Sequence, residues 1–322
     1  MIRYALSRIG QSLLVLVLAF TVVFWAVSVL PSDPATIFVA KGDGYFNPEV
    51  VEQVKQFYGY DKPLLEQYFG QMVQVASGNF GFSLSSGQAT LDRISGVIGE
   101  TLKLATTATV FAIAISIGIV LLATTNRSSR LRKVILNIPP LFSSVPTFWL
   151  GLVILQIFSV QLGLFSLFPD GSVASFVIPA LVLAVPLSAP IAQVLLKNAE
   201  DTMRLPHIAT ARAKGGTPGW VVRKHVLKNA AGPALTVTAT TLGALLGGSV
   251  VTETVFSRSG LGSVLMDAVA TQDISLLQGL VLLTTVVIVG INLAVDLIYP
   301  LLDPRVTKVQ SNGFNTRLGR FK

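Results

Sequence analysis

Six long apolar segments without a single charged side chain alternate with polar stretches along this sequence. They are Gly10–Leu30, Leu104–Thr125, Ser144–Leu164, Phe176–Leu196, Ala234–Thr252 and Ile274–Val295. A helix needs about 20 mostly apolar residues to cross a bilayer, and in lipid it must satisfy its backbone hydrogen bonds internally. The pattern therefore predicts an all-α polytopic membrane protein with about six transmembrane helices.

Prolines interrupt two of these segments. Pro139, Pro140 and Pro146 break the uncharged run 134–169 around the third segment, which allows part of that run to lie along the membrane interface. We expect the prolines of the fourth segment to kink its helix, because neighbouring helices can cover the freed carbonyl groups. They are Pro179, Pro186 and Pro190.

The polar stretch 31–100 is the only sizeable piece outside the apolar segments. Two short helices are predicted in it, one from Pro48 to just before Gly59 and one from Pro63 to Ala76. The stretch is too short for a self-sufficient domain, so we expect a small helical extracytoplasmic cap. The chain then divides into 1–30, this segment at 31–100, a five-helix core at 101–302 that contains a cytoplasmic loop at 197–231, and a cytoplasmic tail at 303–322.

Charge sets the expected orientation. Most of the 24 Lys and Arg lie before the first segment, at 127–133, at 197–228 and at 305–322. The positive-inside rule therefore places both termini in the cytoplasm, and the net charge of +8 gives no indication of nucleic-acid binding. The first segment is longer than the apolar region of a signal peptide and lacks a small-x-small cleavage site, so we expect it to be retained. The chain contains no cysteine, which excludes disulfides.

A polar island at 205–229 separates the fourth and fifth segments. Pro206 suits the first turn of a helix, Gly215 suits the position after its C-cap, and Thr217-Pro218 suits the start of a second helix. Ala209 and Ala213 share one face, small enough for another surface to approach closely. Basic residues surround that face: Arg212, Lys214, Arg223, Lys224 and Lys228. The small face and the basic residues around it together indicate an element that docks into another protein. The basic residues alone would indicate only the membrane topology of the loop.

Thr210-Ala-Arg-Ala-Lys-Gly215, followed by Asn229-Ala230, resembles the "EAA" loop of ABC-importer permeases, and most of all that of the oligopeptide/dipeptide/nickel permease family. Similar motifs follow in order along nearly the whole chain: Pro31-Ser-Asp-Pro-Ala35, Gly78-Asn-Phe-Gly81, Val145-Pro-Thr-Phe-Trp-Leu-Gly151, Glu253-Thr-Val-Phe-Ser257 and Leu302-Asp-Pro-Arg305. The chain departs from the family at 205–209, where an acidic residue, Tyr, Val and Arg are usual, and this bears on the individual ATPase contacts.

The resemblance implies a type I ABC importer permease fold with both termini inside. It also implies that the 205–229 loop is a coupling helix seated in a cytoplasmic ATPase. The implied contact residues are Ile208, Ala209, Thr210, Ala211, Arg212, Ala213, Lys214, Gly215 and Gly216.

Candidates for a solute path are polar residues without charge in the third and fifth segments. They are Ser143, Ser144, Thr147, Thr238, Thr241 and Ser249. At any one position helix packing is the alternative. Glu253, near the outer end of the fifth segment, either belongs to an outer gate or reaches water. Asp296, near the inner end of the sixth, is expected to pair with Arg or cap a helix rather than transfer protons.

No catalytic, nucleotide-binding or metal-binding constellation occurs in the sequence. The phosphate-loop pattern Gly-x-x-x-x-Gly-Lys-Ser/Thr is absent. The only two histidines, His207 and His225, lie in the polar island, where we expect them to face solvent. We therefore expect a non-catalytic subunit without a cofactor of its own, with ATP and Mg²⁺ bound by partner ATPases.

The resemblance implies a multi-pass subunit of a bacterial or archaeal plasma membrane that forms half of a translocation pathway. The implied partners are a second permease subunit, two cytoplasmic ATPase subunits or domains, an extracytoplasmic solute-binding protein and the lipid bilayer. A di- or oligopeptide is the favoured solute, and nickel, a metal chelate or another small solute is the alternative. An autonomous ion-coupled carrier or intramembrane hydrolase is disfavoured, because we find no inverted repeat, no midplane ionisable residue and no membrane-embedded histidine.

Overall fold

The computed structural model describes residues 2–28, 48–58, 61–83, 85–126, 128–166, 168 and 170–302. These residues are predominantly helical. Among them, β-structure is limited to an isolated antiparallel bridge between Phe82 and Ala89. The predicted all-α class is confirmed. The motif at 31–35 and the tail at 303–322 lie outside the described residues, so what was predicted for them stays a prediction.

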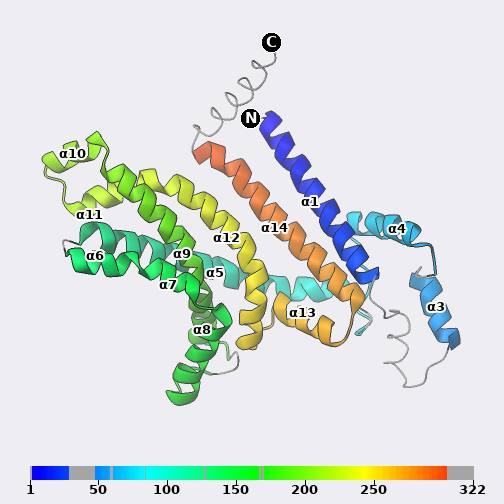
Figure 1. The fold of residues 1–322 in the computed structure, drawn as a ribbon. Helices are drawn as coiled ribbons and strands as arrows, with labels where there is room; N and C mark the ends of the chain where they lie inside the picture. The colour runs from blue at the N-terminus through cyan, green and yellow to red at the C-terminus, as the bar shows by residue number, and fades with distance from the viewer. Residues whose placement is uncertain are drawn as a thin grey trace, which may run out of the picture. The chain divides into compact units, whose positions relative to one another are not determined.

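Long helices carry most of the fold (Figure 1). They are α1 (Ile2–Ser28), α5 (Thr90–Thr125), α9 (Val173–Met203), α12 (Leu227–Val255) and α14 (Ile274–Leu302). In the described part, 4 helices are long and apolar enough to cross a membrane, and counting each of two bent pairs as one span gives up to 6. This agrees with the predicted number of about six.

The helices predicted between the first two spans are present. α3 (Pro48–Tyr58) ends just before Gly59, and α4 (Leu64–Ala76) follows Pro63, which is its N-cap. Helix signals in short amphipathic segments were therefore sufficient to locate both elements.

The third apolar segment is bent. α6 (Ser129–Leu136) and α7 (Ile138–Ser144) form one arm, α8 (Thr147–Ile154) and the π-helical η1 (Leu155–Gln161) form the other, and the arms meet at 98°. The helix predicted to begin at Ser144 begins at Thr147 instead. A proline disfavours the helical conformation of the residue before it, and Val145, which precedes Pro146, is extended at φ −92° and ψ 121°.

The fourth span, α9, continues as one helix through all three of its prolines. On α5 the fully buried Ser116 hydroxyl donates a hydrogen bond of 2.9 Å to the Ser188 carbonyl oxygen of α9. Polar groups on a neighbouring helix can supply such hydrogen bonds where proline disturbs the regular ladder.

The chain groups into two compact units. The first contains 1–9, 102–258 and 290–322, and its core joins α5 and α9 to the polar island through side chains such as Val120, Leu195 and Val226. The second contains 10–101 and 259–289. Its core includes Ile94 and Leu276 with α13 (Leu261–Ala270). The division proposed from the sequence concerns membrane topology and stays a prediction.

Within the second unit, α14 passes very close to the start of α5 at Gly279. A Cβ at this glycine would overlap the Thr90 Cγ2 atom, and both residues are buried. We expect Gly279→Ala to force the two helices apart and to lower the free energy of unfolding by about 1–3 kcal/mol, as overpacking does. Thermal unfolding of the purified protein in detergent measures this.

Gly290→Ala on the same helix is the matched control, because nothing lies within 4 Å of the Cβ it would add. We expect it to leave the unfolding temperature unchanged. Equal unfolding temperatures for the Gly279→Ala and Gly290→Ala proteins would contradict the close approach.

Candidate functional site

The polar island folds into two short helices joined by a glycine hinge. α10 (Pro206–Ala213) begins with proline at N1, and α11 (Pro218–Val221) begins after Thr217, whose side chain accepts a hydrogen bond from the Trp220 N–H. A π-helical turn, η2 (Val222–Val226), then leads into α12. The helix starts and the hinge predicted from the sequence are confirmed.

Glycine is required twice in the hinge. Gly215 has φ +85°, a left-handed conformation that glycine adopts without strain. Its N–H donates to the Arg212 carbonyl at 2.9 Å, and the Gly216 N–H donates to the Ala211 carbonyl at 3.1 Å. These two bonds form a Schellman motif that ends α10. A Cβ on Gly216 would lie 2.8 Å from the Ala211 carbonyl oxygen, so even alanine does not fit.

The island has an inner and an outer face. Ile208, Val221 and Val222 are at most 2% exposed and pack into the core of the first unit. Ala209 and Ala213 are exposed. Ile208 was predicted to be part of the contact surface, but its side chain anchors the loop to the helix bundle. The exposed alanines and basic residues are the part available for docking.

An open hollow of about 590 Å³ lies between the two short helices. It is lined by His207, Thr210, Ala211, Lys214, Gly215, Gly216, Thr217, Trp220 and His225. Trp220 is 41% exposed, with the Lys224 ammonium 4.9 Å from its ring centroid and the His225 ring centroid 5.2 Å away. His207 is exposed as predicted, whereas His225 is half-buried against Trp220.

The sequence reasoning missed the hollow and the role of Trp220 in it. An aromatic residue inside a basic, polar stretch was the available signal, because exposed tryptophan is enriched where proteins bind other proteins. The hollow presents an aromatic wall, basic groups and hydroxyls on one loop. It is therefore suited to receive side chains of another protein.

The candidate pore residues divide by burial. Ser143 and Ser144 are exposed, Thr147 and Thr241 are half-buried, and Thr238 and Ser249 are buried. Three of these hydroxyls donate to carbonyls of their own helices: Ser144 to Pro140 at 2.9 Å, Thr238 to Ala234 at 2.8 Å and Thr241 to Val237 at 2.9 Å. Burial within the chain favours the packing role for Thr238 and Ser249, and the pore assignment stays a prediction.

The two acids have different outcomes. Glu253 is only 1% exposed and interacts with other groups of the chain, so of its two alternatives the one in which it reaches water is wrong. Its role in an outer gate stays a prediction. Asp296 lies in α14, but its side chain is outside the described residues. Its expected role in pairing or capping stays a prediction.

A buried carboxylate that the sequence reasoning missed lies in the second unit. Asp273 is 1% exposed and accepts hydrogen bonds from the Ser83 hydroxyl at 2.6 Å, the Ser85 hydroxyl at 2.8 Å and the Ser85 N–H at 2.9 Å. Its other oxygen accepts from the Leu276 N–H at 3.0 Å, which caps α14. An aspartate directly before an apolar helical run was the signal that could have revealed this cap.

Hydrogen bonding decides the charge of Asp273. Burial alone would raise its pKa, but the bonds from Ser83, Ser85 and Leu276 outweigh burial and lower the pKa below its usual value. Beside it, Arg93 forms an ion pair of 2.8 Å with Asp267 on α13. This polar cluster ties the loop that closes the 31–100 stretch to the turn between α13 and α14.

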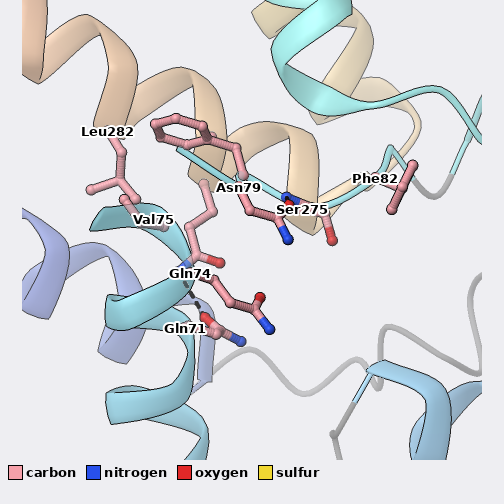
Figure 2. Close-up of a pocket in the computed structure, with 11 residues that line it drawn as sticks. Gln71, Gln74, Val75, Asn79, Phe82, Ser275 and Leu282 are labelled. Atoms are coloured by element: carbon pink, nitrogen blue, oxygen red, sulfur yellow. Dashed lines mark hydrogen bonds between the residues drawn. The ribbon is translucent and has the colours of Figure 1, made fainter. Parts of the chain in front are cut away.

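A small polar pocket of about 80 Å³ lies nearby, between α4, the loop at 79–82 and α14. Figure 2 shows Gln71, Gln74 and Asn79 among the side chains that line this pocket, together with Ser275 and Leu282 of α14. The Gln278 amide donates to the Gln71 side-chain oxygen at 3.1 Å. The pocket is too small for a peptide. The hydrogen bond between Gln278 and Gln71 at this pocket connects α14 to α4.

Over the described residues, His, Asp and Glu form no group of three or more that could hold a metal ion.

Two family models match the chain. A binding-protein-dependent transport system inner membrane component matches residues 112–308, and the N-terminal model of such membrane components matches 1–95. The glutathione transport system permease protein GsiC of Escherichia coli (strain K12) is 32% identical over 306 residues, which cover 95% of this chain and 99% of that protein. GsiC of Shigella flexneri serotype 5b (strain 8401) has the same identity and coverage.

Solved structures support the fold. The MetNI methionine ABC transporter in an inward-facing conformation is similar with a TM-score of 0.54 at 22% identity, over 65% of this chain and 95% of that chain. Proteins of the matched family are transporter permease subunits, generally without catalytic activity, and are multi-pass proteins of the inner membrane. The chain therefore belongs to the membrane permeases of binding-protein-dependent ABC importers, of the peptide and oligopeptide type.

Proposed function

We propose that this chain forms one half of the translocation pathway of an importer for short peptides. The observation that carries the solute class is the 32% identity, over nearly the whole chain, to a permease for glutathione, which is itself a short peptide. The uncharged hydroxyls of the third and fifth spans are compatible with a peptide path. A binding protein on the outer side delivers the solute and sets most of the specificity.

The 205–229 loop couples this permease to ATP hydrolysis on partner ATPases. Its glycine hinge, its exposed Ala209 and Ala213 and its aromatic hollow support this role. Basic side chains at its rim favour an acidic partner surface, because complementary charge steers association. ATP and Mg²⁺ bind to those partners, and this chain contributes the surface on which their movement acts.

Both termini and this loop lie in the cytoplasm, a placement that the distribution of Lys and Arg supports. α3 and α4 then lie on the outer side, and α4 lies at the surface of the membrane. A second permease subunit completes the pathway, because up to six candidate spans from one chain provide half of it.

A metal chelate is the second candidate solute. The argument for it is the resemblance of the loop to a family that also contains nickel permeases. The described residues form no metal-binding cluster, which means that a chelate would be recognised by its organic groups.

Affinity purification from the native membrane tests the proposal. We expect the chain, tagged at Lys322 and extracted in mild detergent, to bring down a second multi-span permease and P-loop ATPases. We also expect cells that lack the chain to lose uptake of a radiolabelled tripeptide and to retain uptake of nickel. A chain that purifies alone, from cells whose peptide uptake does not depend on it, would contradict the proposal.

A further inference from the structure

α4 is apolar over about half of its circumference, yet the chain covers only part of that surface. At 3.6 residues per turn, its apolar residues occupy one continuous arc of about 180°. They are Leu64, Leu65, Tyr68, Phe69, Met72, Val73, Val75 and Ala76. The opposite arc is polar, with Glu66, Gln67, Gln71 and Gln74. Such a division is typical of a helix that lies between an apolar and an aqueous phase.

One flank of the apolar arc packs on α1. Tyr68 contacts the buried rings of Phe20 and Phe24, each with ring centroids 5.3 Å away, and its hydroxyl hydrogen-bonds the Thr21 hydroxyl at 2.9 Å. Met72 and Val75 pack against the same cluster. In Figure 1, α4 crosses the C-terminal half of α1 rather than running along it.

The other flank has no cover within the described chain. Leu65 is 65% exposed, Phe69 is 57% exposed and Val73 is 66% exposed. They lie four residues apart, so they form one stripe along the helix. We call Leu65, Phe69 and Val73 the outer stripe of α4.

The position of α4 along the membrane span of α1 indicates what covers this stripe. The apolar span of α1 extends from Leu6 to Ala26. Thr21, which binds Tyr68, therefore lies about 7 Å along the helix axis inside the end of that span, at 1.5 Å per residue. Amphipathic interfacial helices bury their apolar faces about 5–10 Å into the boundary between headgroups and acyl chains, and the position of Tyr68 falls in this range.

α1 also presents apolar side chains that the described chain leaves uncovered. Leu18 and Val22 are 54% and 67% exposed in a helix that belongs to a membrane span. The outer stripe of α4 is a second exposed apolar surface, on the helix that contacts α1 through the Phe20–Phe24–Tyr68 cluster. If water filled the space at this depth, the exposed apolar surface of α1 and the outer stripe of α4 would both be hydrated. Acyl chains cover both surfaces.

We propose that α4 is an interfacial helix whose outer stripe, Leu65, Phe69 and Val73, is immersed in the acyl chains of the leaflet that surrounds the C-terminal half of α1. Its polar arc faces the aqueous phase. The membrane thereby holds α4 at a fixed depth beside α1 and α14, and with it the polar pocket of Figure 2. The inference rests on α1 being a membrane span and is independent of the solute or of ATP coupling.

Single thiols test this, because the chain contains no cysteine of its own. Phe69→Cys and Val73→Cys are labelled with an environment-sensitive fluorophore, and the chain is assembled with its partner subunits in nanodiscs. Quenching is compared between lipids brominated on the acyl chain and iodide in the buffer. Val22→Cys is the lipid-facing control, and Gln74→Cys on the polar arc is the aqueous control.

We expect brominated lipid to quench both stripe positions as strongly as Val22→Cys, with blue-shifted emission and no quenching by iodide. Gln74→Cys should show the reverse. Iodide quenching of Phe69→Cys and Val73→Cys equal to that of Gln74→Cys would overturn the proposal. Protection from both quenchers that arises only with the second permease or the binding protein would also overturn it and would assign the stripe to a protein interface.

Discussion

We expect Gly216→Ala to lower solute-stimulated ATP hydrolysis by the assembled transporter about 5- to 150-fold while the chain still inserts into the membrane. The added Cβ would lie 2.8 Å from the Ala211 carbonyl oxygen, 3.0 Å from Val221 Cγ2 and 3.1 Å from Trp220 Cε3. The nearest of these is a backbone atom, so the end of α10 must shift. Overpacking of this kind costs about 1–3 kcal/mol, which changes a coupled equilibrium about 5- to 150-fold.

Gly219→Ala is the control for this substitution. It changes the same residue type three positions later, and nothing lies within 4 Å of the added Cβ. We expect it to support ATP hydrolysis and peptide uptake at the unmodified level. Normal coupling in the Gly216→Ala transporter would show that the shape of the hinge does not matter for energy transfer.

The second large effect is expected at Asp273. Asp273→Ala removes hydrogen bonds to a carboxylate from two serine side chains and two backbone N–H groups. Bonds to charged groups contribute about 1.5–3 kcal/mol each, so we expect the free energy of unfolding to fall by about 3 kcal/mol or more. The unfolding temperature of the purified protein in detergent is the measurement.

Asp267→Ala is the control for this substitution. The ion pair of Asp267 with Arg93 is partly exposed, with 19% of the Arg93 side chain and 48% of the Asp267 side chain accessible to solvent. Such pairs contribute about 0–1 kcal/mol, so only a small loss is expected. Equal losses for Asp267→Ala and Asp273→Ala would show that the buried hydrogen bonds of Asp273 do not stabilise this part of the fold.

The contribution of Asp273 to the free energy of unfolding should depend on pH in the acid range. Its pKa in the folded protein is lowered, so the stabilisation is fully present above the unfolded value of about 3.9 and is lost as the pH falls through the folded pKa. Unfolding temperatures measured downward from pH 5 should therefore converge for the native chain and the Asp273→Ala variant. A constant difference between them would exclude a lowered pKa.

Much of the membrane architecture was predictable from local patterns. Charge-free apolar runs located the spans, because the bilayer requires about 20 such residues in a row. The hinge of the island was equally predictable, since Gly215 and Thr217-Pro218 carry their own conformational preferences. The collinear motifs further indicated a permease of this family, which the comparisons confirm.

Features that depend on distant contacts were not predictable in this way. Burial of Glu253 reflects packing around the end of α12, which its sequence neighbours do not reveal. Asp273 meets serines that lie 188 and 190 residues earlier in the chain.

The functional surface shows the same division. The basic and small residues of the island were recognisable by type and spacing. Ile208 lies among them and yet faces the core, since one helix turn presents side chains in opposite directions. The hollow around Trp220 is formed only when α10 and α11 fold back on each other.

The most direct test of the central claim is cross-linking from the exposed face of α10 in native membranes. Ala213→Cys, carrying a photoreactive benzophenone, is compared with Lys62→Cys, which lies before α4 and is 54% exposed. We predict that illumination joins the Ala213 position to a P-loop ATPase, and that the Lys62 position yields no ATPase adduct. An ATPase adduct at Lys62, or none at Ala213 in membranes that contain the assembled transporter, would contradict the account of how this permease is driven.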